Sequence, residues 1–330
     1  MGDKTVLLTG GAGYIGSHVA LDLVMEGYEV IILDDLSKGF AEAVINCELV
    51  QGDTGNKDLL VLLLEKRQIG AVMHLAGSTV VPESVRKPLM YYENNTAKSR
   101  NLIEACVECG VRRFVFSSTA AVYGIPDSGQ VTLETPTEPV NPYGMSKLMT
   151  EIMLRDLSGV APLSYAALRY FNVAGAAQDA GIGQRHDDSA THIIPRLLMA
   201  LAGGAGHMTI HGDDYPTPDG TCVRDYIHVE DLVAAHVAGL ERLMGGGASQ
   251  VYNLGTGRGA SVREVIEAAG DVVGYPPQIQ VGPRREGDAV RLVSGSARAG
   301  SELNWRPKSS DLETILADAW AWHKTQGWQE

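Results

Sequence analysis

Short apolar runs alternate with helical patterns through the first half of the chain. The runs cover residues 6–8, 30–33, 49–50, 71–75 and 114–116. They lack the alternation of a half-exposed strand, which is typical of strands covered on both faces of a parallel sheet. Helical patterns lie between them at 13–26, 57–67, 90–109 and 143–157. The order predicts an α/β fold with a Rossmann-like, doubly wound parallel sheet.

After about residue 174 the pattern becomes less regular. Polar or irregular stretches occupy 178–191 and 212–222. Helical patterns return at 192–202, 229–243, 261–273 and 311–323. We therefore predict a first domain over 1–174 and a smaller α/β domain over 175–330, some segments of which return to the first domain.

Composition narrows the classes of function. The 330 residues carry a net charge of −13 and no basic stripe, which argues against a nucleic-acid partner. An anionic ligand would therefore be bound locally, by backbone N–H groups and a few arginines. The N-terminus lacks a signal-peptide pattern, and no apolar run is long enough to span a membrane. We expect a soluble, cytoplasmic protein without a membrane partner.

The cysteines do not predict a metal site. Cys106 and Cys109 form a C-x-x-C inside a helical pattern, and the other two, Cys47 and Cys222, do not form the second pair that a zinc site would need. We expect reduced, packed thiols and no bound metal.

A glycine-rich turn follows the first apolar run. Gly10, Gly13 and Gly16 are spaced G-x-x-G-x-x-G where a helix begins, and Asp34 ends the next apolar run. Small residues let the backbone approach a pyrophosphate, and the helix N-terminus supplies N–H donors. A carboxylate at Asp34 accepts from ribose hydroxyls and repels a 2′-phosphate, which predicts NAD rather than NADP. Asp53 follows the third run, where it either reaches the adenine or serves only a turn.

A second pattern predicts the chemistry. Tyr143 and Lys147 lie four apart in a helical pattern, on one face of the helix. A free tyrosine has a pKa of about 10, and a nearby ammonium together with a positive nicotinamide ring would favour its phenolate. Tyr143 would then take a proton from a sugar hydroxyl. Thr119 follows the 114–116 run, at the strand end that faces the ligand crevice of an open α/β sheet.

These residues resemble the extended short-chain dehydrogenase/reductase family and, within it, the UDP-glucose 4-epimerases. The similarity extends over essentially the whole chain. It is carried by 10–16, Asp34, 87–88, 91–95, 116–124, 143–147, 168–172, 212–217, 219–229, 252–255 and 284–288. The 212–229 stretch is the most characteristic part.

The resemblance implies a reaction and a cofactor. Tyr143 would deprotonate the 4-hydroxyl of UDP-glucose or UDP-galactose while hydride passes to tightly held NAD. The 4-keto sugar would then turn over and accept hydride on its other face, which inverts C4 without net redox change. Catalysis is assigned to Tyr143, Lys147 and Thr119. Cofactor binding is assigned to Gly10, Gly13, Tyr14, Ile15, Gly16, Asp34, Asp53, Thr54, Ala76, Asn94, Tyr143, Lys147 and Tyr170.

The resemblance also assigns the substrate site, with NAD in the first domain and the UDP-sugar mainly in the second. Substrate binding falls to Thr119, Tyr143, Asn172, His192, Arg224, Arg285 and Asp288. Guanidinium forks suit a diphosphate, and Asp288 would lie near the uridine ribose. The alternative for Arg224 is an ion pair with Asp225 or Asp231. A homodimer built on the helices around 90–109 and 143–157 is also implied.

Five positions depart from the family pattern. Thr119 stands where serine is frequent and keeps the hydroxyl. Thr79 replaces a lysine near the cofactor, His192 an asparagine, and His211 an aromatic near the uracil. Leu292 lies where side-chain size is thought to set room for an N-acetyl group, and it is smaller than tyrosine. UDP-N-acetylglucosamine is therefore an additional candidate substrate.

The sequence leaves three other hypotheses about the function open. The chain could epimerise another UDP-sugar, such as UDP-glucuronate or UDP-xylose. It could release NADH as a plain oxidoreductase, or bind nucleotide without catalysis, although the Tyr143 and Lys147 pair is intact. A sugar dehydratase is disfavoured, because Ala120 and Ala121 stand where that family has an acid and a base.

Overall fold

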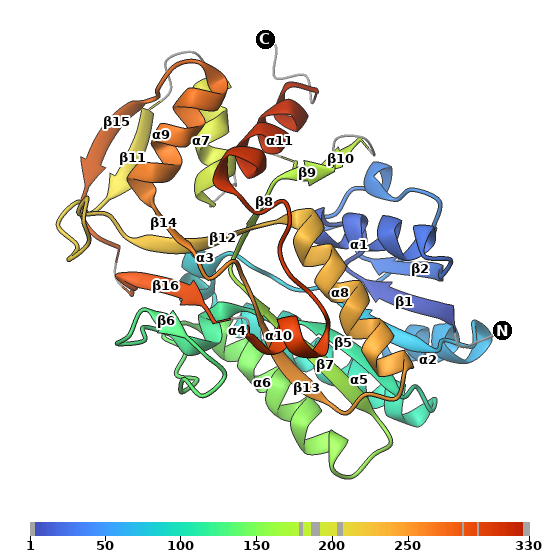
Figure 1. Ribbon diagram of the computed structural model, residues 1–330. Helices are drawn as coiled ribbons and strands as arrows, with labels where there is room; N and C mark the ends of the chain where they lie inside the picture. Colours follow the sequence, from blue (N-terminus) through green and yellow to red (C-terminus); the bar gives the residue numbers. More distant parts are fainter. Residues whose placement is uncertain are drawn as a thin grey trace.

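The computed structural model describes residues 4–177, 181–185, 192–202, 207–285, 287–295 and 297–325. Its main element is a seven-stranded parallel sheet in the order β13-β7-β5-β4-β1-β2-β3 (Figure 1). The strands are β1 (Thr5–Thr9), β2 (Glu29–Asp34), β3 (Glu48–Gln51), β4 (Ala71–His74), β5 (Arg113–Ser117), β7 (Ser164–Tyr170) and β13 (Gln250–Leu254). The predicted α/β class and parallel, doubly wound sheet are confirmed.

Helices cover both faces of this sheet. They are α1 (Tyr14–Met25), α2 (Lys57–Lys66), α5 (Lys98–Glu108), α6 (Pro142–Ser158) and α8 (Val229–Met244). Val6 and Leu8 pack with the layer of α1 and α8, whereas Leu7 packs with α2, α5 and α6. Both faces of β1 are therefore buried, which is why its sequence is an unbroken apolar run.

Two strands of the sheet were not predicted. β7 ends in Leu168-Arg169-Tyr170, and its buried arginine interrupts the apolar pattern. β13 comes from the second half of the chain and pairs with β7 at the edge of the sheet. The predicted helix at 90–109 is divided into α4 (Pro88–Tyr92), a π-helical turn (Glu93–Ala97) and α5.

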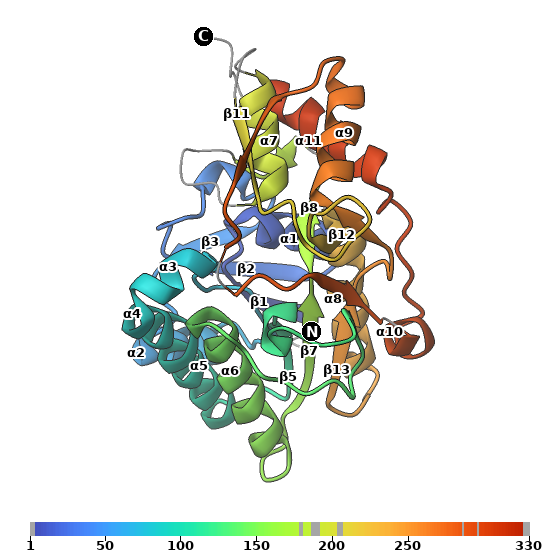
Figure 2. The same cartoon turned by 90° about the vertical axis from the view of Figure 1, so that its left-hand side faces the viewer.

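A second unit lies beyond the carboxyl ends of the strands (Figure 2). Its central strand β12 pairs with β8, β14 and β16, and β16 pairs with β6. Its strands are β6 (Gln130–Val131), β8 (Asn172–Ala174), β9 (Ala176–Ala177), β10 (Ile182–Gly183), β11 (His207–His211), β12 (Val223–His228), β14 (Gly259–Ser261), β15 (Gln278–Gly282) and β16 (Arg291–Ser294). Its longer helices are α7 (Ile193–Ala202), α9 (Val262–Val273) and α11 (Leu312–Thr325), which share one apolar core.

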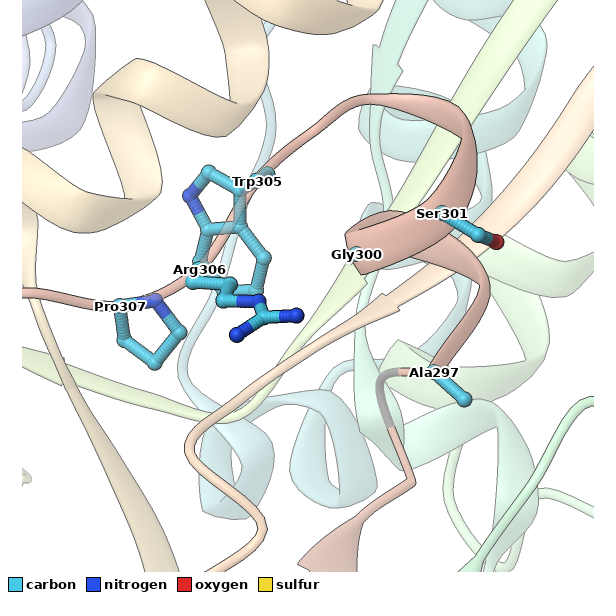
Figure 3. Close-up of a pocket in the computed structure, with 6 residues that line it drawn as sticks. All are labelled: Ala297, Gly300, Ser301, Trp305, Arg306 and Pro307. Carbon is cyan, nitrogen blue, oxygen red and sulfur yellow. The ribbon is translucent and has the colours of Figure 1, made fainter.

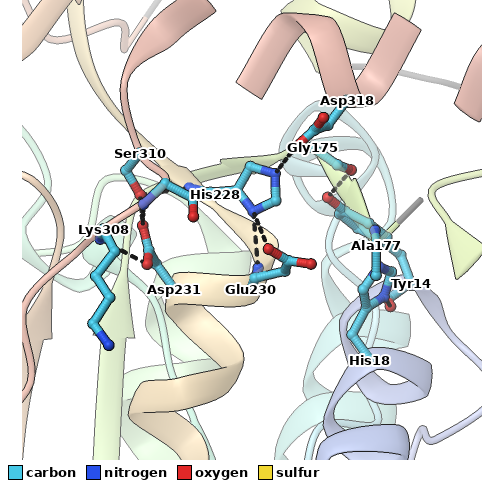
Figure 4. Close-up of polar contacts among 11 residues, drawn as sticks. Tyr14, His18, Gly175, Ala177, His228, Glu230, Asp231, Lys308, Ser310 and Asp318 are labelled. Carbon is cyan, nitrogen blue, oxygen red and sulfur yellow. Dashed lines mark hydrogen bonds and ion pairs between the residues drawn. The ribbon is translucent and has the colours of Figure 1, made fainter. Parts of the chain in front are cut away.

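Short elements connect these parts. They are α3 (Val81–Arg86), α10 (Ala297–Glu302) and the 3-10 turns Ala41–Ala43 and Ala120–Tyr123. Where the two sheets meet, His228 lies 3.2 Å from Asp318 of α11, and its backbone N–H donates to Ser310 (Figure 4). Beside it the Tyr14 hydroxyl donates to the carbonyl of Gly175 at 2.7 Å. These partly buried bonds join α1 to the segment after β8, and the end of β12 to the segment around α11.

Among the described residues, no helix has the length and apolarity needed to cross a membrane. All four cysteines are free thiols.

Candidate active site

The glycine-rich turn forms a cradle of closely packed backbone. Gly10 has φ +73°, and a Cβ there would lie 2.5 Å from the backbone nitrogen of Ala76. A Cβ on Gly16 would lie 2.1 Å from the carbonyl oxygen of Gly10. Gly13 precedes α1 and offers no side chain to cap its first N–H groups. An uncapped helix N-terminus beside bare backbone fits the pyrophosphate of a dinucleotide.

Asp34 lies beside this cradle and is fixed by two backbone N–H groups. Its carboxylate accepts from the backbone N–H of Ala12 at 3.0 Å and of Leu36 at 2.9 Å. Burial raises the pKa of Asp34, and the two N–H groups oppose that rise. The carboxyl is thus fixed at the end of β2, one strand away from the cradle, as ribose recognition requires.

The other residues predicted at the cofactor differ in what they already bind. Asp53 forms an ion pair with Lys98 at 2.7 Å and accepts from the N–H of Gly55, so its carboxylate already serves a turn. Thr54 is buried, and Ala76 supplies the backbone against Gly10. Ile15 lies in the first turn of α1 and packs at the edge of the main core.

The π-helical turn supplies a residue that sequence reasoning missed. Asn95 accepts from the backbone N–H of Ser78 at 2.7 Å and donates to the carbonyl of Ser78 and to Ser146. Its neighbour Asn94, which was predicted, donates to the Ser78 hydroxyl at 3.0 Å. Asn95 therefore fixes the loop after β4 against α6, and the extra residue of a π turn is a frequent mark of such sites.

Tyr143 lies in the first turn of α6. Asn141 caps that helix by accepting from the N–H of Gly144, and Pro142 occupies the first position. Tyr143 is 8% exposed and Thr119 is 7% exposed. Burial raises the pKa of Tyr143, and a hydrogen bond with Thr119 lowers it in part. The structure thus brings the predicted base and the predicted hydroxyl together.

Lys147 lies one turn further along α6 and is buried. Its Nζ donates to the carbonyl of Ser117 at 2.9 Å and lies 5.0 Å above the ring of Phe116. Burial lowers the pKa of Lys147 to about 8, and the charge of Glu151 opposes that fall. Since Lys147 lies one helical turn from Tyr143, an ammonium at this position would favour the phenolate of Tyr143.

Tyr170 contacts Ser117, the residue to which Lys147 also binds. Its hydroxyl lies 2.8 Å from the Ser117 hydroxyl, which is also 3.3 Å from Nε2 of His236. Burial raises the pKa of Tyr170, so its hydroxyl stays protonated. Two polar groups of Ser117 are thus bound, the hydroxyl by Tyr170 and the carbonyl by Lys147.

The predicted substrate arginine has a different partner from those expected. Arg224 on β12 forms an ion pair with Asp288 at 3.2 Å. Asp225 accepts from Thr256 and from the N–H of Ser294, and Asp231 accepts from backbone N–H groups of 308 and 309. The expected alternative for Arg224, a pair with either neighbour, is therefore wrong, because both carboxylates are already engaged.

Arg284 and Arg285, which are adjacent in sequence, differ in their contacts. Arg284 binds Asp214 at 2.6 Å and stacks on Tyr215 at 4.2 Å. Arg285 is exposed, so its guanidinium can reach a ligand. The hydroxyl of Tyr215 is buried and has no partner among the described residues, which sequence reasoning did not indicate.

The remaining predicted residues lie around the second unit. Asn172 pairs with Tyr226 across β8 and β12, and Leu292 is the register partner of Arg224. Leu292 packs on the cluster that contains Phe171. His192 is exposed just before α7, and His211 ends β11. A separate groove beside α10, lined by Trp305 and Arg306, contains none of the predicted site residues (Figure 3).

Comparison with known proteins gives a consistent result. The model of the NAD dependent epimerase/dehydratase family matches residues 6–255. A UDP-glucose 4-epimerase of Azospirillum brasilense is 50% identical over 321 residues, which covers 97% of this chain and 92% of that one.

Solved structures agree with the sequence relatives. UDP-glucose 4-epimerase from Brucella ovis in complex with NAD has a TM-score of 0.93 and 42% identity, covering 96% of this chain and 98% of that one. The enzyme from Stenotrophomonas maltophila with bound NAD and formylated UDP-arabinopyranose has a TM-score of 0.95 and 38% identity, covering 98% and 99%.

Proposed function

The chain belongs to the NAD dependent epimerase/dehydratase family, within which it is a UDP-glucose 4-epimerase that uses NAD, and we propose that Tyr143, Thr119 and Lys147 carry its chemistry. The observation that supports this assignment is the contact between Tyr143 and Thr119, with Lys147 one helical turn away. We further propose that the seven-stranded sheet holds NAD and that the second unit holds most of the UDP-sugar.

The proposed roles follow from the contacts. The Tyr143 oxygen takes the proton of the sugar 4-hydroxyl and later returns it, and Thr119 hydrogen-bonds the same reacting oxygen. Lys147 places its ammonium one helical turn from Tyr143 and donates to the carbonyl of Ser117. Tyr143 and Thr119 are nearly buried, so bulk water is kept from the proton being transferred.

The cradle of Gly10, Gly13 and Gly16 fits NAD, with Asp34 at the adenine ribose. NAD held by this cradle would supply the redox chemistry, as the acceptor and donor of the hydride at C4 of the sugar. The 4-hydroxyl loses one proton and C4 loses one hydride, and both are later returned. The reaction therefore balances without an added oxidant.

We propose that Arg224 and Arg285 bind the diphosphate and that Asp288 and Asn172 contact the nucleoside and sugar. Arg224 is already fixed by Asp288, which orients its guanidinium. His192, just before α7, is proposed as a further substrate contact.

The experiment is to incubate the purified protein with UDP-galactose, without added NAD, and to follow the sugar by proton NMR. We expect UDP-glucose to accumulate to a fixed ratio, which requires a retained cofactor. Absence of conversion, even after NAD is added, would contradict the assignment. UDP-N-acetylglucosamine, UDP-glucuronate and UDP-xylose in the same assay would rank the alternatives.

We propose acceptance of the N-acetylated substrate as a second activity because of one contact. Leu292 packs on the cluster of Phe171 opposite Arg224, and leucine leaves more room there than an aromatic residue. Leu292→Tyr is expected to reduce turnover of UDP-N-acetylglucosamine more than that of UDP-galactose. Equal loss for both would show that this side chain does not set the choice.

We propose a homodimer built on α4 and α6. These helices expose Leu89 and, less fully, Met90, Met149 and Ile152. Leu89 and Met149 line the same groove. These side chains lie on helices that contact each other, and Figure 2 shows α4, α5 and α6 on one flank of the sheet. Exposed apolar residues gathered on one face are typical of an interface.

The dimer is tested by the mass of the protein in solution. Leu89→Glu and Met149→Glu are expected to shift it from dimer to monomer in light scattering. Ile279→Glu, on β15 away from this face, is the control and should leave the mass unchanged. A wild-type monomer, or equal effects of all three substitutions, would contradict the proposal.

We propose that the enzyme works in the cytoplasm. Its four thiols are free, and burial raises the pKa of Cys106, which keeps that thiol unreactive. A reducing compartment suits such a chain. Detection of the activity only in a secreted fraction would contradict this location.

A further inference from the structure

Three residues on α6 meet three consecutive residues at the end of β5. Tyr143, Lys147 and Glu151 are spaced four apart, so they share one face of the helix. Tyr143 contacts Thr119, and Lys147 donates to the carbonyl of Ser117. Ser118, between them, donates from its hydroxyl to Glu151. The helix and the strand end are therefore joined at every position that carries the chemistry.

Glu151 takes no part in the proposed reaction, yet it is a buried charge. Its carboxylate receives a fork from Arg169 of β7, with Nη2 at 2.5 Å and Nε at 3.0 and 3.1 Å. The side chains are 5% and 9% exposed. A buried ion pair of this kind often adds little net stability compared with apolar residues of the same volume. A contribution to the stability of the fold is thus a weak explanation for the presence of Glu151.

The same network reaches Thr119 from its other side. Arg169 donates from Nη1 to the hydroxyl of Tyr123 at 2.9 Å, and that hydroxyl donates to Asn253 of β13 at 2.6 Å. Tyr123 ends the 3-10 turn that Thr119 caps. Thr119 therefore lies between two residues, Ser118 and Tyr123, that are both held by the Glu151–Arg169 pair.

We infer that Glu151, oriented by Arg169, is a positioning residue for the epimerase reaction. It binds Ser118 directly and reaches Tyr123 through Arg169, which fixes Thr119 against α6, so that the hydroxyls of Thr119 and Tyr143 reach the same oxygen of the sugar. Misplacement of reacting groups by about 1 Å can cost roughly a hundredfold in rate. Glu151 also opposes the burial that lowers the pKa of Lys147, which is a second way for it to act on the site. The inference rests on the proposed function.

Ser118→Ala is the cleanest test, because it cuts the link to Glu151 and leaves the ion pair intact. We expect kcat for UDP-galactose to fall between about tenfold and a hundredfold, with KM changed by less than about threefold. Tyr252→Phe is the control, since it removes a hydroxyl that donates to Glu302 at the end of α10 at 2.9 Å. It should leave both constants near those of the wild type.

A double-mutant cycle separates positioning from a general loss of structure. If Ser118 acts through Thr119, Ser118→Ala should have little further effect in a Thr119→Val background. A full additional loss of kcat in that background, or no loss in the wild-type background, would overturn the inference. The wild type must epimerise UDP-galactose in the same assay, so failure of the proposed function would be seen separately.

Glu151→Gln is the second variant. It keeps the shape and the acceptor for Ser118 but leaves the charge of Arg169 uncompensated. We expect it to lower kcat at least as much as Ser118→Ala. Glu151→Gln with wild-type kcat would overturn the role of the carboxylate, and circular dichroism with thermal melting would show whether the variant is folded.

Discussion

Arg224 and Asp288 are 64 positions apart in sequence, yet their side chains form an ion pair at 3.2 Å. This ion pair orients the fork of Arg224, which we propose to bind the diphosphate; a lysine cannot bind a diphosphate in the same bidentate way. Arg224→Lys is expected to raise KM for UDP-galactose about tenfold, with a smaller change in kcat, because diphosphate binding is equal in ground and transition states. Steady-state kinetics measure this split.

Arg284→Lys is the control for that substitution. Arg284 binds Asp214 at an exposed position, where an ion pair contributes little. The KM of Arg284→Lys for UDP-galactose should stay near that of the wild type. Equal increases of KM for both variants would show that the effect is one of general charge and not of the Arg224 fork.

The hydrogen bond between Thr119 and Tyr143 predicts a pH dependence. That bond lowers the pKa of Tyr143, so Thr119→Val raises it. Tyr143 acts as a base only when deprotonated, and the acidic limb of kcat/KM should therefore move to higher pH. Activity should be lost most at low pH and partly regained as pH rises. A limb that is unmoved, or that moves to lower pH, would contradict the role of Thr119.

Gly10 and Gly110 provide a matched pair for the cradle. Both have a positive φ, +73° and +74°, but a Cβ on Gly10 meets the backbone of Ala76, whereas nothing lies within 4 Å of one on Gly110. Gly110→Ala should cost only the backbone strain of about 1–2 kcal/mol. Gly10→Ala should cost more and should reduce the amount of NAD that copurifies. Chromatography of the released nucleotide and thermal melting measure the two effects, and similar losses of both in the two variants would contradict the steric argument.

Substitutions at Asp34 and Asp35 test whether cofactor choice depends on the carboxylate of Asp34 or only on the local structure. Asp34 is buried at the end of β2, whereas the neighbouring Asp35 is exposed and binds Ser37. Asp34→Asn should weaken NAD binding about tenfold or more, because a hydrogen bond to a charged group is worth roughly 1.5–3 kcal/mol. It should also reduce the discrimination against NADP. Asp35→Asn should change neither, and titration of each cofactor into stripped protein would show whether it does.

Local patterns sufficed for the main elements and for the centre of the site. The apolar runs of β1 and β2 are continuous because both faces are buried, and that requirement acts on neighbouring residues. The glycine spacing and the four-residue interval from Tyr143 to Lys147 are local as well, since a turn and one helical repeat set them. For that reason the glycine turn before α1 and the shared helix face of Tyr143 and Lys147 could be predicted from the sequence.

The partners of charged side chains were decided only by the tertiary structure. Arg169 breaks the apolar pattern of β7 because Glu151, from a different element, neutralises it inside the protein. Arg224 pairs with Asp288 instead of with either nearby carboxylate, because Asp225 is already held by Thr256. A hydrogen bond depends on distance and direction in space, and residues far apart in sequence leave no periodic pattern that records which of them will meet.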